Sequence, residues 1–226
     1  MHLQKSKKNI IYFFLLIMFG SINNVNLRNI EINKIKSINV DGLESKENRI
    51  ISEKIADLKL NNIFSLDSDK IKKILETNPS VEKYKVFKNY PSSIKINIIK
   101  TKFIAKINID GNTFIVGSNG KLSDNHLSSD ELPFIFGKPD VDEFLEFKKI
   151  FDKSKFEYNQ VKNLYFFPSK RWDIEFKNNK ILKLPEKSVD ISLDYLFEFL
   201  NNKKLSNIKI IDARIKNQII LNEWRK

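Results

Sequence analysis

The longest continuous apolar run of the chain, Ile10 to Ile22, lies near the N-terminus, directly after Lys5, Lys7 and Lys8. A basic start, an apolar segment and a polar exit are typical of a secretory signal peptide. An uncleaved signal-anchor helix fits as well, because the exit lacks the pattern of small residues that a signal peptidase prefers. Both interpretations export the remainder of the chain, since lysines before an apolar segment keep the N-terminus in the cytoplasm.

The composition excludes several kinds of site. The chain has no cysteine and only two histidines, His2 and His126. A disulfide framework, a thiolate metal site and a cysteine nucleophile are therefore excluded, and a histidine-based metal cluster is nearly so. We expect neither a metal nor a cofactor.

The net charge of +12 does not by itself predict nucleic-acid binding. Lysine supplies 35 of the 40 basic residues and arginine only five. Proteins that bind nucleic acid rely on arginine for bidentate and stacking contacts. The lysines are scattered through alternating strands, so solvated faces are the favoured interpretation. An attraction to anionic lipid headgroups near Lys34 and Lys36 stays open.

Residues 36–100 follow the order strand, helix, helix, strand, strand. Apolar residues recur at helical spacing in two segments. The pair Asn78-Pro79 ends the second of these helices, because proline disfavours a helical conformation at the residue before it. Residues 93–100 alternate between isoleucine and polar side chains, which indicates one packed and one wet face. We expect a small α+β unit with two helices on one face of a three-stranded sheet.

Strands dominate the chain after Thr101, and two predicted helices, residues 141–154 and 190–201, interrupt them. Asn178-Asn179 is a predicted hairpin turn, because asparagine tolerates positive φ. The predicted strands are residues 103–109, 113–116, 161–167, 171–176, 180–184, 207–211 and 215–221.

The sequence offers no catalytic constellation. A serine hydrolase would depend on His126, which lies in a polar stretch without a glycine-flanked nucleophile turn. A glycosidase needs two carboxylates about 5–9.5 Å apart, and nothing in the sequence pairs them. A glycine-rich phosphate loop is absent from the sequence too. We expect that the protein is not an enzyme.

Several short sequence segments resemble, in their order and spacing, those of the bacterial cell-division family FtsQ, called DivIB in Gram-positive bacteria. The strand-helix-helix-strand-strand unit resembles the polypeptide-transport-associated (POTRA) domain of that family. The resemblance covers residues 35–224. The segments that carry it are Ile38–Leu43, Lys72–Glu76, Asn78–Val81, Val86–Pro91, Thr101–Ala105, Phe114–Leu122, Leu132–Gly137, Arg171–Ile174, Lys180–Leu184 and Ile211–Asn217.

The resemblance implies an α+β fold with a transmembrane helix, a small POTRA domain (β-α-α-β-β) and a mainly antiparallel β domain with two helices. The implied segments are a cytoplasmic tail (1–8), a transmembrane signal-anchor (9–27), a linker (28–34), the POTRA domain (35–101) and the β domain (102–226).

The family resemblance also implies a non-enzymatic, single-pass type II protein of the bacterial inner membrane. Its C-terminal domains would lie in the periplasm, enriched at the division septum. There it would scaffold the divisome by binding FtsB and FtsL, and so link early and late septation proteins. Two alternatives stay open: another POTRA-containing export or outer-membrane assembly component, and a secreted periplasmic binding module.

The partner site implied by the resemblance lies on the last strand, where a sheet edge is open to strand addition. Ile219 and Leu221 are equally well explained as core residues, and Arg214 as an ion-pair partner of Asp212 or Asp173. On the POTRA unit, two lysines that are also explained as solvated charges are predicted contacts for other division proteins. The predicted partner-binding residues are Arg214, Ile215, Asn217, Ile219, Leu221, Trp224, Lys83 and Lys85.

Overall fold

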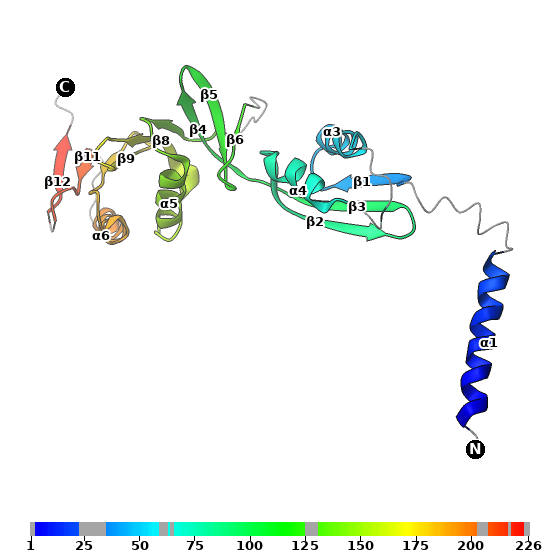
Figure 1. Cartoon of the computed structure of the whole chain (residues 1–226). Coiled ribbons are helices and arrows are strands. Elements are labelled where there is room, and N and C mark those ends of the chain that lie inside the picture. Colours follow the sequence, from blue (N-terminus) through cyan, green and yellow to red (C-terminus); the bar gives the residue numbers. More distant parts are fainter. Residues whose placement is uncertain are drawn as a thin grey trace. The chain divides into compact units, whose positions relative to one another are not determined.

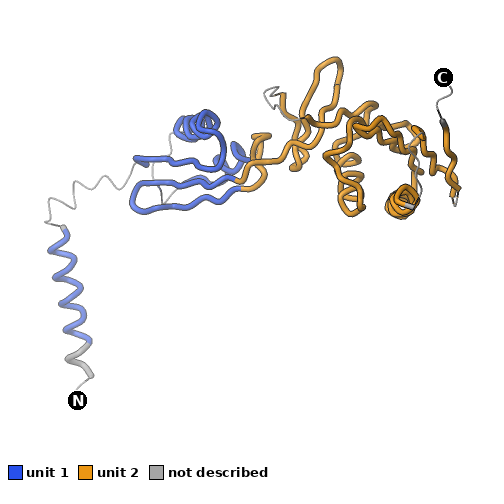
Figure 2. Tube along the Cα trace, turned by 180° about the vertical axis from the view of Figure 1, so that it is seen from behind, with its two compact units in different colours: residues 1–75, 84–98 blue, residues 76–83, 99–226 orange. Residues whose placement is uncertain are grey.

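The computed structural model describes residues 3–22, 35–58, 63, 66–124, 131–202, 208–216 and 218–223. The chain divides into two compact units (Figure 2). The first unit comprises residues 1–75 and 84–98, and the second comprises residues 76–83 and 99–226. The predicted α+β class is confirmed.

The N-terminal helix α1 (Leu3–Ile22) begins inside the predicted cytoplasmic tail. Lysine and glutamine are good helix formers, so the helix extends through the basic residues before the apolar run. Its ten large apolar side chains from Ile10 to Phe19 are between 42% and 71% exposed. In the described part of the chain, no helix combines the length and the apolar character needed to cross a membrane. Residues 23–27 of the predicted signal-anchor lie outside the described residues.

The strands and helices from β1 to β3 follow the predicted order strand, helix, helix, strand, strand (Figure 1). The strands form a three-stranded sheet in the order β1-β3-β2, in which β1 runs parallel to β3. The elements are β1 (Ser37–Asp41), α3 (Ser45–Ala56), α4 (Ser68–Thr77), β2 (Val81–Asn89) and β3 (Ser93–Lys100).

Alternation along β3 decides which face of this sheet is covered. Ile94, Ile96 and Ile98 are buried, whereas Lys95 and Asn97 between them are exposed. Successive side chains of a strand point to opposite faces, so one face is packed and the other is open to water. Each helix contributes two buried side chains, which are Ile51 and Ile55 of α3 and Ile71 and Leu75 of α4. The helices therefore cover one face, as predicted.

The second unit is built on a nine-stranded sheet in the order β12-β11-β10-β9-β8-β7-β4-β5-β6. The strands are β4 (Phe103–Ile109), β5 (Asn112–Gly117), β6 (Leu122–Ser123), β7 (Phe134–Phe136), β8 (Val161–Phe166), β9 (Trp172–Phe176), β10 (Ile181–Lys183), β11 (Ile208–Asp212) and β12 (Ile220–Glu223). The helical elements are α5 (Val141–Phe151), the short 3-10 helix η1 (Tyr158–Gln160) and α6 (Val189–Asn202).

The large sheet is mainly antiparallel, as predicted, but it also contains parallel pairs that the sequence did not predict. Three of its eight strand pairs are parallel, namely β10 with β11, β7 with β8, and β4 with β7. Helix α5 connects β7 to β8, and α6 connects β10 to β11. A helical crossover brings the chain back in the same direction, so the strands that it joins run parallel. The predictions missed β6 and β7, because strands of two and three residues are too short to show alternation.

The core of the second unit lies between the sheet and its two long helices. Ile174 of β9 is in register with Leu182 of β10, which is in register with Ile211 of β11. All three side chains are fully buried in one cluster with side chains of α5 and α6. The neighbouring row, Asp173, Lys183 and Asp212, is likewise in register and points to the face without these helices.

Residues 76–83 belong to the second unit because hydrogen bonds hold them there. The Asn119 side-chain amide donates to the carbonyl oxygens of Pro79 (3.0 Å) and Val81 (2.8 Å). The backbone N–H of Thr101 donates to the Ser80 carbonyl at 3.0 Å, and both Thr101 and Ser80 are buried. The segment that leads into β2 is therefore tied to the turn after β5.

Candidate partner-binding edge

Strand β12 forms one edge of the nine-stranded sheet. In the described ranges of the chain it pairs with β11 alone, in antiparallel register with Ile211 opposite Leu221 and Asp212 opposite Ile220. The far side of an edge strand presents backbone N–H and C=O groups to any strand that approaches. The predicted last strand therefore does lie at an open edge of the sheet.

The predicted bounds of this strand, residues 215–221, were wrong. β12 begins only at Ile220 and runs to Glu223. Ile215 and Lys216 lie in a bend and a turn instead, and the Gln218 N–H donates to the Ile215 carbonyl at 3.1 Å. The alternation of apolar and polar residues resembled a strand, but a turn is needed for the chain to reverse beside β11.

The register assigns the edge side chains to two faces. Leu221 shares the helix-covered face with the buried Ile211, yet it remains 37% exposed because no further strand covers it among the described residues. Ile220 shares the helix-free face with Asp212 and is 48% exposed. Ile219 is half-buried against the core cluster, so the core explanation is correct for this residue.

Sequence reasoning missed Ile220. The expected strand placed Ile215, Ile219 and Leu221 on one face, and Ile220 fell on the other. Only the pairing of β12 with β11 identifies Ile220 as a site residue. Leu221 is opposite the buried Ile211, so its neighbour Ile220 lies on the helix-free face. That pairing is a contact between distant residues and is not visible in a local pattern.

Arg214 is paired with Asp212 and not with Asp173. Its Nε donates to Asp212 Oδ1 at 2.8 Å. Asp173 instead accepts from Arg171 Nε at 3.3 Å. The hydrogen bond from Arg214 lowers the pKa of Asp212, although burial opposes this shift. The guanidinium remains partly exposed, so it lies at the surface beside the edge strand.

Asp173 is the one buried acidic residue in the described part of the chain, with an exposed fraction of 5%. Burial raises its pKa, although the charges of Arg171 and Lys183 act in the opposite direction. In register along the helix-free face, Lys183 stands between Asp173 and Asp212. The alternating charges compensate one another, so this row is explained as a structural ion network.

The other predicted site residues are divided among separate places. Ile215 is exposed in the turn before β12. Asn217 and Trp224 lie outside the described residues. Lys83 and Lys85 are exposed on β2, one of the two edge strands of the three-stranded sheet, and so belong to a different sheet from β12.

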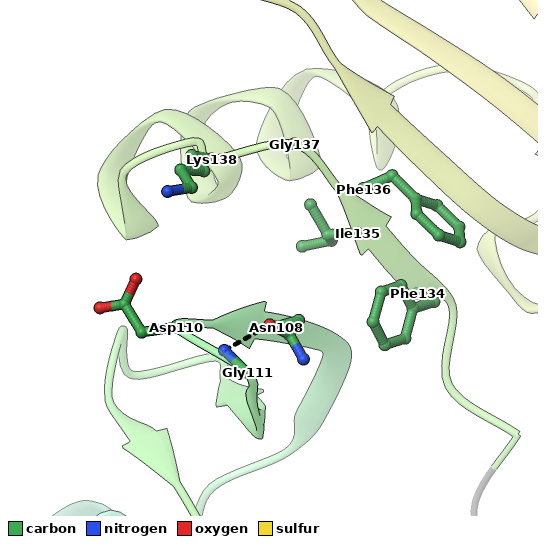
Figure 3. A pocket seen from close by; sticks show the side chains of 8 residues that line it. All are labelled: Asn108, Asp110, Gly111, Phe134, Ile135, Phe136, Gly137 and Lys138. Carbon is green, nitrogen blue, oxygen red and sulfur yellow. Dashed lines mark hydrogen bonds between the residues drawn. The ribbon is translucent and has the colours of Figure 1, made fainter.

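A shallow hollow of about 400 Å³ lies in the second unit, between the β4–β5 turn and the end of β7 (Figure 3). Asn108 accepts the Gly111 N–H at 3.0 Å and so shapes the turn, while Asp110 and Lys138 flank the opening. The lining residues are Asn108, Asp110, Gly111, Phe134, Ile135, Phe136, Gly137 and Lys138. None of them is a histidine, cysteine, serine or threonine, so the hollow lacks the hydroxyl or thiol nucleophile and the imidazole base of a hydrolytic triad. Among the described residues, no group of three His, Cys, Asp or Glu side chains could hold a metal ion.

Two family models match consecutive parts of the chain. Residues 33–100 match the POTRA domain of FtsQ type, and residues 104–214 match the C-terminal domain of the cell-division protein FtsQ/DivIB. The second match ends at Arg214, before β12 begins.

Relatives agree with these matches. The cell-division protein FtsQ of Rickettsia felis is 24% identical over 196 residues, covering 84% of this chain and 73% of the relative. FtsQ of Bradyrhizobium diazoefficiens is 23% identical over 164 residues, covering 71% and 48%. DivIB of Bacillus subtilis is 28% identical over 130 residues, covering 57% of this chain and 49% of the relative. Together with the order of the two domains, these similarities show that the chain belongs to the FtsQ/DivIB family of cell-division proteins.

Proposed function

We propose that this protein is a non-enzymatic scaffold of the divisome, and that β12 takes up a strand of an FtsB/FtsL partner. The observation that carries the proposal is an edge strand with exposed isoleucine and leucine side chains at the end of a nine-stranded sheet. Backbone hydrogen bonds to the open edge would supply affinity, and the side chains beside it would supply specificity.

The surroundings of β12 support a protein partner. Ile220 and Leu221 lie on opposite faces of the edge, so a strand added there would be contacted from both sides. Arg214 offers an exposed cation next to the edge. Apolar anchors surrounded by polar residues are the usual composition of a binding hot spot.

We infer that the N-terminal segment, residues 9–27, anchors the chain in the inner membrane with the folded units in the periplasm. The support is the exposed apolar surface of α1, since ten consecutive large apolar side chains have no protein neighbours that bury them among the described residues. Such a surface is stable in contact with lipid rather than water. Mass measurement of the protein from membranes tests this, because an intact N-terminus is expected and a new terminus near residue 21 would favour secretion.

Enrichment at the septum and a link between early and late septation proteins follow from the same proposal. Lys83 and Lys85 on β2 remain predicted contacts for other division proteins through their exposed charges rather than through strand pairing. The chain would then carry one contact region on each sheet.

The central test removes residues 214–226 from the full chain and measures binding to the FtsB/FtsL pair of the same organism. We expect binding to be lost, because the deletion removes the whole edge strand. Hydrogen-exchange protection of β3 amides should persist, which would show that the first unit stays folded. A truncated chain that binds as well as the full chain would disprove strand addition at β12.

A further inference from the structure

The tip of the β2–β3 hairpin carries aromatic side chains that are exposed to solvent. Phe87 is 44% exposed and Tyr90 is 60% exposed. The turn between the strands is closed by a hydrogen bond from the Ser93 hydroxyl to the Asn89 carbonyl, 3.2 Å long. Two large rings are therefore held at the end of an ordered hairpin, and the core of the first unit does not bury them.

The same hairpin is basic toward its tip. The part of it that belongs to the first unit, residues 84–98, contains Lys85, Lys88 and Lys95 and no aspartate or glutamate. Lys95 is 3.8 Å from Asp41 of β1, but both side chains are exposed, and exposed ion pairs contribute little. The tip thus combines aromatic rings with positive charge.

The chain enters the first unit at this same end of the sheet. Ser37, the first residue of β1, is in parallel register with Ser93, the first residue of β3 (Figure 1). The N–H of Lys36 donates to the Ser92 carbonyl at 2.7 Å, so a fourth lysine lies beside the turn. The entry point of the chain from α1 and the hairpin tip are therefore adjacent.

The connection to α1 limits how far this tip can be from the anchor. Fifteen peptide bonds separate Ile22 from Ser37, and a fully extended chain of that length spans about 50 Å. The covalent chain therefore limits the distance between α1 and the entry point beside the basic and aromatic tip to about 50 Å.

We propose that the β2–β3 hairpin tip is a second membrane contact, in which Phe87 and Tyr90 enter the headgroup region of an anionic bilayer. Aromatic rings favour the interface between lipid and water, and lysines are attracted to anionic headgroups. Lys36 and Lys88 would meet the lipid phosphates. The proposal rests on the anchoring by residues 9–27 proposed above, and it would restrict the rotation of the first unit about its linker.

The absence of cysteine from the sequence makes a direct test simple. Asn89→Cys in the full chain places an environment-sensitive fluorophore at the tip and leaves both aromatic rings in place. Asn97→Cys is the matched control, because this exposed residue is in register with Asp41 at the opposite end of β1. Both labelled chains are incorporated into vesicles of phosphatidylcholine, with or without phosphatidylglycerol.

We expect the emission of the probe at residue 89 to shift to the blue and rise several-fold when phosphatidylglycerol is present. The probe at residue 97 should not respond. The double variant Lys36→Glu and Lys88→Glu should reduce the response several-fold. Lys46→Glu with Lys102→Glu changes the net charge equally at exposed positions that follow the opposite ends of β1 and β3, so it should leave the response intact.

Flotation of the same samples measures anchoring separately. If the chain floats with the vesicles but the probe at residue 89 does not respond, the hairpin contact is disproved and anchoring stands. Equal losses from both charge variants would also disprove it, since the attraction would then be unspecific. If the full chain fails to float, the anchoring proposal fails and the hairpin contact fails with it.

Discussion

Two sheet edges of this molecule differ in the side chains that they present. β2 is a nine-residue edge strand of the three-stranded sheet, with exposed lysines at positions 83 and 85. β12 is a four-residue edge strand of the nine-stranded sheet, and its exposed side chains include Ile220 and Leu221. The sequence from Asn217 to Trp224 contains no lysine.

The two edge strands differ in whether charged side chains protect them from pairing with another strand. A long edge strand invites unwanted pairing, and charged side chains, lysine above all, are a common protection. β2 has this protection, and β12 has apolar side chains in its place. We therefore interpret β12 as the edge that is kept open for a partner and β2 as the edge that is kept from pairing.

The largest expected effect on binding comes from placing a lysine on β12, in imitation of the exposed lysines of β2. Ile220→Lys should weaken binding to FtsB/FtsL by about 3 kcal/mol, in the range of a binding hot spot, because a charge would have to be buried when a strand is added. Calorimetric titration of the full chain in detergent measures the change. Ile191→Lys on α6, an isoleucine of the second unit that is also exposed, is the control and should bind normally. An unchanged affinity for Ile220→Lys would remove the distinction between the two edges.

A smaller effect is expected at the aromatic residue that follows β12. Trp224→Ala should weaken the same binding by about 1–3 kcal/mol, because tryptophan beside an open edge is a typical anchor. Tyr195→Ala removes an exposed aromatic ring from α6 and should have no effect. If the two variants bind equally well, Trp224 is not an anchor.

The protection of β2 can be removed in the reverse experiment. Lys83→Ile combined with Lys85→Ile should increase self-association, detected by sedimentation, because a long apolar edge would become available. Affinity for FtsB/FtsL should change by less than about 0.5 kcal/mol, as for other surface substitutions away from an interface. Lys46→Ile with Lys54→Ile on α3 controls for the added hydrophobicity. Self-association of both double variants to the same degree would contradict a protective role of the β2 lysines.

The smallest effect concerns the ion pair beside β12. The pKa of Asp212 is lowered in the folded protein, so its contribution to the free energy of unfolding is present above the ordinary aspartate pKa of about 4. It is lost as the pH falls through the lowered value. Asp212→Asn should therefore cost roughly 0.5–1 kcal/mol at neutral pH, as for a partly exposed ion pair, and progressively less as the pH falls below about 4.

The fluorescence of the buried Trp172 can report this unfolding in a Trp224→Phe background, which leaves a single tryptophan. Asp194→Asn on the exposed side of α6 serves as the control. A stability difference between Asp212→Asn and the parent chain that persists unchanged at low pH would show that the carboxylate charge is not its cause.

Much of the fold could be predicted from local patterns. The alternation in residues 93–100 predicted β3 with its correct bounds, and β4 was likewise predicted at Phe103–Ile109. The predicted turn at Asn178-Asn179 is confirmed by the positive φ of Asn179. These features depend on residues close together in the chain, so the pattern contains the information needed.

The candidate site was less predictable. The sequence identified an edge strand at the end of the chain, but the predicted strand began five residues too early. Ile220 was not among the predicted partner-binding residues. It also left both Asp212 and Asp173 as partners of Arg214, and the structure selects Asp212. Both decisions depend on which strands lie next to each other.

The sequence by itself determined the apolar N-terminal run, the order of elements in the POTRA-type unit and the resemblance to the FtsQ/DivIB family. Only the tertiary structure decided that the large sheet is mixed, that β12 stands at its edge, and that Ile220 and Leu221 face opposite sides of it. The physical reason is that side-chain periodicity is a local property, whereas register is decided by hydrogen bonds between residues far apart in the chain. A shift of one residue in that register exchanges the two faces of a strand.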